Sequence, residues 1–95
     1  MSDVKVIRLV SGEEVICFAK QVEGGWSIEK PGLLVPTEKG IGIMSMMPYT
    51  NIESQATFIK EAMVGFVTTP VAGLEQQYRS INQTIITREN KIVMV

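Results

Sequence analysis

The glutamates beside the first two predicted turns come closest, by type and spacing, to a site for chemistry. Glu13 and Glu14 follow Gly12, and Glu23 precedes Gly24. Three carboxylates together would suit a hard cation, but Ca²⁺ takes about six or more oxygen ligands. Neighbouring residues such as Glu13 and Glu14 also point to opposite faces of a strand. The pattern therefore favours solvated carboxylates, and we expect neither a metal nor a cofactor.

Histidine is absent, and this absence excludes several kinds of catalytic site. Without histidine there is no Ser-His-Asp or Cys-His nucleophile system, no His-ligated zinc and no histidine pH switch. Cys17 is the one cysteine, so an internal disulfide or an all-cysteine zinc site is impossible. The chain also has no glycine-rich phosphate-binding loop. We expect a protein that is not an enzyme, with Cys17 as a small buried hydrophobic residue.

The composition predicts one small, mildly acidic domain. The chain has 95 residues, a net charge of −1 and a pI near 5.4, which argues against a broadly basic nucleic-acid binder. Hydrophobic residues make up 45% of it, and its mean hydropathy is +0.19. A small chain has proportionally more surface, so we expect another subunit to cover some of this apolar material.

Membrane and export signals are not expected. No segment reaches the roughly 18 apolar residues that a membrane span needs. The first residues, Met-Ser-Asp-Val-Lys-Val, lack the basic and then apolar organisation of a signal peptide. A single cysteine agrees with a reducing compartment. The expectation is a soluble cytoplasmic protein without a membrane partner.

The residue types predict a mainly β chain. Val and Ile supply 22 residues and Leu only 4, and β-branched side chains pack well on a pleated surface. Strands are expected at Val4–Val10, Glu14–Val22, Trp26–Glu29 with a continuation at Leu33–Val35, Ile41–Met47 and Ala56–Thr68. The first two strands are apolar on both faces, which predicts burial by a core and by something else. Pro31 should interrupt or bend the third strand, and Gly65 marks a bulge or a close-packing point.

One helix is predicted over Pro70–Asn82. Thr69 is a suitable N-cap, and proline suits the first helical position. An apolar stripe recurs at helical spacing: Val71, Leu74, Tyr78 and Ile81. The whole chain, 1–95, is thus one domain with strands over 1–68, a helix over 69–83 and a β-like tail over 84–95. Short strands, tight turns and one helix predict a small barrel or a strongly bent sheet.

The first thirty residues resemble the first signature motif of Sm-like (LSm) proteins. The matching positions are Ile7, Leu9, Gly12, Val15, Ala19, Val22 and Glu23, with Trp26 and Ser27 at the base-stacking and asparagine positions. Cys17 stands where the family has its second glycine. Small Sm-like proteins of phage and marine environmental sequences look most similar, which would place the protein in the cytoplasm of a host cell.

The second signature motif of that family is a strand ending in Ile-Arg-Gly, a turn and a short closing strand. Ile59-Lys60-Glu61, followed by Val64–Val67, resembles it, with lysine for the arginine and glutamate for the glycine. A competing match lies in the tail, at Thr87-Arg88-Glu89-Asn90-Lys91-Ile92. The earlier match is preferred because its closing strand is more apolar and a predicted helix follows it.

The resemblance implies a strongly bent five-stranded antiparallel barrel, SH3-like in outline, whose copies join edge to edge in a homo-oligomeric ring. The expected ring edge consists of Val64, Gly65, Phe66 and Val67. If the matching positions have the roles that they have in the family, Trp26 would stack a base of single-stranded RNA and Ser27 would hydrogen-bond a base edge. Lys60 would meet phosphate or base, and Glu23 would orient the loop.

Each of these residues also has a plain structural interpretation. Trp26 after a turn can be core or interface packing, Ser27 an ordinary strand residue and Lys60 a solvated charge. Two functions therefore stay open. One is a ring-forming Sm-like protein that binds single-stranded nucleic acid, RNA before DNA, with a role in RNA or DNA processing. The other is a homo-oligomeric scaffold or assembly protein that keeps the ring without binding nucleic acid.

Overall fold

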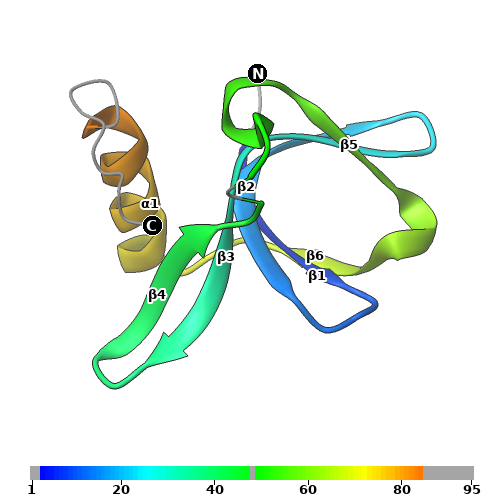
Figure 1. Ribbon diagram of the computed structural model, residues 1–95. Coiled ribbons are helices and arrows are strands. Elements are labelled where there is room, and N and C mark those ends of the chain that lie inside the picture. Colours follow the sequence, from blue (N-terminus) through cyan, green and yellow to red (C-terminus); the bar gives the residue numbers. More distant parts are fainter. Residues whose placement is uncertain (1–2, 48, 85–95) are drawn as a thin grey trace.

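The computed structural model describes residues 3–47 and 49–84 (Figure 1). In these ranges it has six strands: β1 (Asp3–Leu9), β2 (Glu14–Val22), β3 (Gly25–Thr37), β4 (Gly40–Ser45), β5 (Thr57–Lys60) and β6 (Val64–Thr68). Two 3-10 helices, η1 (Ile52–Ser54) and η2 (Glu61–Met63), and one α-helix, α1 (Ala72–Thr84), complete it. The predicted tail over 85–95 and the competing motif at 87–92 lie outside the described residues.

All six strands belong to one antiparallel sheet with the order β4-β3-β2-β1-β6, and β5 also pairs with β3. The prediction of a mainly β fold is confirmed. The prediction of five strands was wrong for the described residues, because η2 divides the strand expected at 56–68 into β5 and β6. The fourth strand also ends at Ser45, earlier than expected. Within residues 3–47 and 49–84, no ladder joins β4 or β5 to β6, so the sheet is bent without being closed by strand pairing.

β3 is irregular near its centre, where its pairing changes on both edges. Its first residues, Gly25–Ile28, pair with β5, and Gly32–Thr37 pair with β4 along the same edge. Between these segments Lys30 has a φ of 51°, and Lys30 and Pro31 together face the single residue Cys17 of β2. The bend predicted from Pro31 is therefore confirmed as a bulge, which re-aims the second half of β3.

Gly65 lies at a second bulge, as predicted. The register between β1 and β6 shifts so that Arg8 faces Phe66 while Leu9 faces Val64. A Cβ atom at Gly65 would lie 2.9 Å from the carbonyl oxygen of Arg8, closer than real Cβ atoms approach. Glycine therefore lets the two backbones approach at the point where β6 loses its regular pairing with β1.

The inner face of the bent sheet holds the larger apolar cluster. Its buried members are Ile7, Val15, Cys17, Ala19, Ile28 and Ile59, with Leu9, Trp26, Leu33, Met46, Val64 and Val67 packed against them. β1, β2, β3, β5 and β6 all contribute to this cluster. At about 25 cal/mol per Å² of apolar surface removed from water, such a cluster is the dominant stabilising feature of a small domain.

The outer face of the sheet holds a second cluster, and α1 covers it. Val4, Val6 and Ile16 are buried there with Tyr78 of α1, and Phe18, Leu34, Ile43 and Leu74 pack around them. Figure 1 shows α1 beside the β3–β4 hairpin and the outer side of β2. The prediction that β1 and β2 are buried on both faces is confirmed. In this part of the sheet the second cover is the chain's own helix, so no second subunit is needed there.

α1 begins two residues later than predicted, at Ala72 instead of Pro70. Thr69 was expected to cap the helix, but its hydroxyl oxygen accepts a 3.2 Å hydrogen bond from the Lys5 ammonium. Of the expected four-residue stripe, Leu74 and Tyr78 pack in the outer cluster, while Val71 and Ile81 are 74% and 40% exposed. Among the described residues, no helix is both long and apolar enough to cross a bilayer.

Candidate nucleic-acid interface

The β2–β3 turn and the end of β5 meet at one end of the sheet. Glu23 and Gly24 form the turn, and Gly24 has a φ of 84°, which glycine adopts without strain. The backbone N–H of Glu61 donates a 3.0 Å hydrogen bond to the carbonyl oxygen of Gly24. This bond ties η2 to the turn. It places the second resemblance motif beside the first, although the two lie more than thirty residues apart in the sequence.

Gly25 makes this approach sterically possible. In the ladder between β3 and β5, Gly25 faces Lys60 and Trp26 faces Ile59. A Cβ atom at Gly25 would lie 2.0 Å from the carbonyl oxygen of Ile59, well inside van der Waals contact. Any other residue type at this position would therefore push β5 away from β3.

The four sequence-predicted residues, Glu23, Trp26, Ser27 and Lys60, do come together here, but not on one face. Trp26 is half-buried and packs against the inner cluster beside Ile59. Ser27 and Lys60 occupy the outer face, because side chains alternate along each strand. The indole is thus placed for core packing, while the serine and the lysine face away from the core.

The electrostatic field at this end of the sheet is weak. Lys60 is exposed, but Glu61 follows it in the chain and Glu23 lies in the adjoining turn, both exposed. Lys20 adds a second exposed cation on the outer face, directly opposite Ser27 in the β2–β3 ladder. Two cations and two anions near one turn provide local contacts for a phosphate and little long-range attraction.

The glutamates considered for a cation do not meet. Glu14 lies 3.5 Å from the Arg8 guanidinium, and the Ser11 hydroxyl donates to Glu13, which lowers the pKa of that carboxyl. Glu23 lies beyond the other end of β2. Within residues 3–47 and 49–84, no three His, Cys, Asp or Glu side chains form a group able to hold a metal ion.

Cys17 behaves as the sequence predicts. Its side chain is fully buried in the inner cluster, where its thiol contacts the Lys5 carbonyl oxygen at 3.9 Å. Burial raises the pKa of the thiol to about 12, from an ordinary value of 9.0. Since the thiolate is the reactive form, the thiol is inert near neutral pH.

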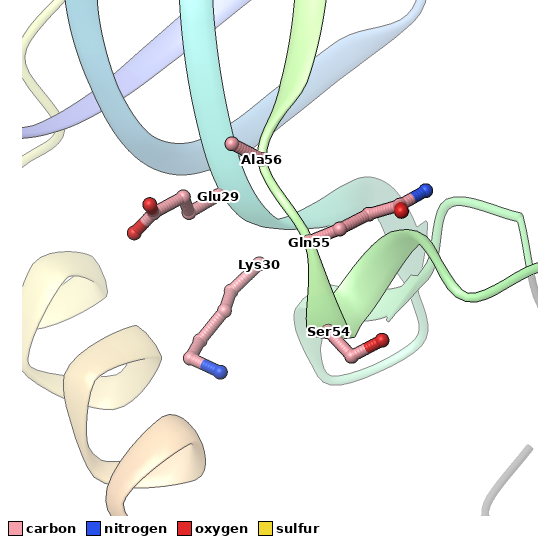
Figure 2. Close-up of a pocket in the computed structure, with 5 residues that line it drawn as sticks. All are labelled: Glu29, Lys30, Ser54, Gln55 and Ala56. Carbon is pink, nitrogen blue, oxygen red and sulfur yellow. The ribbon is translucent and has the colours of Figure 1, made fainter.

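A shallow pocket of about 260 Å³ lies between the bend in β3 and the segment after η1 (Figure 2). Its lining residues are Glu29, Lys30, Ser54, Gln55 and Ala56. In Figure 2 the Glu29 and Gln55 side chains point in opposite directions, so their polar groups do not converge on one volume. The pocket contains none of the sequence-predicted site residues.

Phe58 is the residue at this end of the sheet that the sequence analysis missed. It faces Ser27 in the β3–β5 ladder, lies on the outer face, and its side chain is 53% exposed. The sequence Thr57-Phe58-Ile59-Lys60 does indicate that Phe58 and Lys60 share one face, because side chains alternate along a strand. Alternation alone did not tell whether that face or the face of Ile59 points into the core.

Comparison with known proteins found no match, either to models of protein families or to curated protein sequences. The resemblance to Sm-like proteins therefore rests on the residues of the two motifs.

Proposed function

We propose that the chain is an Sm-like subunit that assembles into a homo-oligomeric ring and binds single-stranded nucleic acid, RNA in the first place. The observation that carries this proposal is the ladder between β3 and β5, in which Gly25 faces Lys60 and Trp26 faces Ile59. The two segments that resemble the family's motifs meet at one turn, where the Glu61 N–H donates to the Gly24 carbonyl oxygen. Family members use the corresponding two turn regions to hold RNA.

The proposed barrel has support in the packing. Five strands contribute side chains to the inner cluster, and η2 is tied to both neighbouring turns. The Val10 N–H donates to the Met63 carbonyl oxygen at 2.9 Å, and the Glu61 N–H donates to that of Gly24. η2 is thus hydrogen-bonded to the β1–β2 turn at one of its ends and to the β2–β3 turn at the other, at the place where strand pairing is interrupted.

The proposed ring has support in the edges and in the surface. β6 pairs with β1 on one side, and among the described residues its other edge carries no strand. The expected ring edge, Val64–Val67, is part of β6, so the unpaired edge of this strand would pair with the next subunit. Several large apolar side chains are exposed in the single chain: Val10, Ile41, Met44, Tyr49, Phe58, Met63, Phe66, Val71 and Ile81. Assembly would remove part of this surface from water.

A second candidate function is a ring-forming scaffold without nucleic acid. It is favoured by the inward packing of Trp26 and by the acidic residues Glu23 and Glu61 beside Lys60. Both functions share the ring, and neither requires catalysis. They differ in whether the turn region binds a polyanion.

Two measurements test the proposal. Light scattering after size exclusion gives the mass in solution, and a strict monomer of 10.5 kDa would exclude the ring. Fluorescence anisotropy with labelled oligo-uridine and oligo-deoxythymidine tests binding, whose affinity should fall as salt rises. An oligomer that binds neither oligonucleotide at low salt would exclude the nucleic-acid function and support the scaffold function. Lys60→Ala should weaken binding while the mass stays that of the ring.

A further inference from the structure

A row of side chains crosses three strands on the outer face, at the end of the sheet that α1 leaves uncovered. Lys20 of β2 faces Ser27 of β3, and Ser27 faces Phe58 of β5. Directly opposed residues in an antiparallel sheet have Cβ atoms about 5 Å apart. Lys60 lies two residues beyond Phe58 on the same face. The register therefore gathers two cations, a hydroxyl and an aromatic ring.

The Phe58 ring lies over the glycines of the β2–β3 turn. Its Cζ atom would be 3.0 Å from a Cβ at Gly25 and 3.8 Å from one at Gly24. The missing side chains leave room for the ring to lie against the backbone, with half of its surface in water. A ring whose tip lies beside the glycine backbone, on a residue that is half exposed to water, is suitable for stacking a base.

We propose that Phe58 stacks a base of the bound single strand while Lys20 and Lys60 contact its phosphates. This inference rests on the proposed nucleic-acid binding, and it moves the stacking contact from Trp26 on the inner face to Phe58 on the outer face. The side chains within the row favour this occupant through short-range contacts. Two exposed lysines beside an aromatic ring complement a polyanion with π faces, and they disfavour a purely apolar partner.

Acidic neighbours set a limit on the affinity. Glu29 lies one row beyond Ser27 on the same face of β3, and Glu61 follows Lys60. Because an anion beside the strand repels phosphate, Glu61→Gln should strengthen binding. Base stacking tolerates different sequences, so the Phe58 contact should contribute to the binding of both oligo-uridine and oligo-deoxythymidine.

The deciding variant is Phe58→Leu, which keeps an apolar cover over Gly25 and removes the π face. Its matched control is Tyr49→Leu, which also removes an exposed aromatic ring. Tyr49 is 82% exposed and lies in the loop between β4 and η1, outside the row and outside the expected ring edge. Affinity for labelled oligo-uridine is measured by anisotropy at low salt, with the mass and the unfolding midpoint of each variant recorded.

Phe58→Leu should weaken binding by about 5- to 150-fold, the range that loss of one stacked base gives. Phe58→Tyr should restore it, and Tyr49→Leu should bind as the unmodified chain does. Unchanged affinity in Phe58→Leu would overturn the inference and leave the proposed function standing. No binding by the unmodified chain would instead remove the proposed function. A loss of oligomer mass in Phe58→Leu would assign Phe58 to a subunit interface and overturn its stacking role.

Discussion

The Tyr78 hydroxyl donates a 2.6 Å hydrogen bond to the carbonyl oxygen of Lys30, which joins α1 to the bend in β3. A longer contact of 3.4 Å reaches the carbonyl oxygen of Glu29. Tyr78 is 1% exposed, and its ring centroid lies 5.1 Å from that of Phe18. The helix therefore binds the sheet through an apolar ring and, at the ring's far end, through a polar group of the bulge.

Removing this hydroxyl should destabilise the fold while the ring packing stays in place. Tyr78→Phe leaves the Lys30 carbonyl without this donor, which we expect to cost about 1–2 kcal/mol of unfolding free energy. Urea denaturation measures the change. Gln77→Ala, at an exposed helical position, is the control and should stay within about 0.5 kcal/mol. Equal midpoints for Tyr78→Phe and the unmodified chain would show that the hydrogen bond adds nothing.

The left-handed backbone at Lys30 should make glycine stabilising there. Lys30 has a φ of 51° and precedes Pro31, a position where the helical regions are disfavoured for a residue with a side chain. Lys30→Gly should raise the unfolding free energy by about 1 kcal/mol. The same change at Lys20, in the regular part of β2, should instead lower it. If both variants are destabilised equally, the bulge is not strained.

Gly25 should tolerate no side chain. Gly25→Ala would place a Cβ atom against the Ile59 carbonyl, so β5 must separate from β3 at a cost of about 1–3 kcal/mol. Gly73→Ala is the matched control, because no atom lies within 4 Å of a Cβ at that helical position. It should stabilise the protein by up to about 1 kcal/mol. Thermal unfolding of the two variants should therefore shift in opposite directions.

The buried thiol of Cys17 should make stability fall at alkaline pH. Its folded pKa of about 12 exceeds the ordinary value of 9.0, so between these values the unfolded chain has lost a proton that the folded chain keeps. The contribution of the thiol to the free energy of unfolding is fully present below about pH 9. Between about pH 9 and about pH 12 it declines by about 1.4 kcal/mol per pH unit. Urea midpoints of the unmodified chain and of Cys17→Ala isolate this contribution. Parallel pH profiles would contradict it.

Neutralising Lys60 should change the salt dependence of nucleic-acid binding. A phosphate contact to a single strand adds about 0.7 to the slope of log affinity against log salt. Lys60→Gln should reduce the slope by about that amount. Lys39→Gln, an exposed lysine in the turn between β3 and β4, is the control of equal charge change. Identical slopes for both variants would show that Lys60 makes no phosphate contact.

The strands and turns could be predicted from the sequence because their signals are local. Alternating β-branched residues, paired glycines and Pro31 predicted β1 to β3 and the bend. The number of strands could not be predicted, because a single 3-10 turn, η2, divides an otherwise apolar segment. The start of α1 was misplaced by two residues: the helix begins at Ala72, and the Thr69 hydroxyl, expected as its cap, accepts a hydrogen bond from Lys5, which is distant in sequence.

The candidate site was predicted in position but not in orientation. Motif residues indicated that Ser27 and Lys60 would lie near each other, and the β3–β5 ladder brings them to the same face. Whether Trp26 or Phe58 faces outward depends on pairing register and on the close approach at Gly25. Register depends on the hydrophobic patterns of both paired strands and on turn geometry, so one segment of sequence does not determine it.

The pairing of β1 with β6 has a consequence for the order of folding. The ladders among β1, β2, β3 and β4 join neighbours in the sequence, so they close short loops at low entropic cost. The ladder between Val6 and Thr68 spans most of the described chain. Since distant pairing is slow to form, we expect a meander of four strands to assemble first and β6 to dock on it afterwards. The strand that would offer the ring edge then becomes available only after the meander has formed.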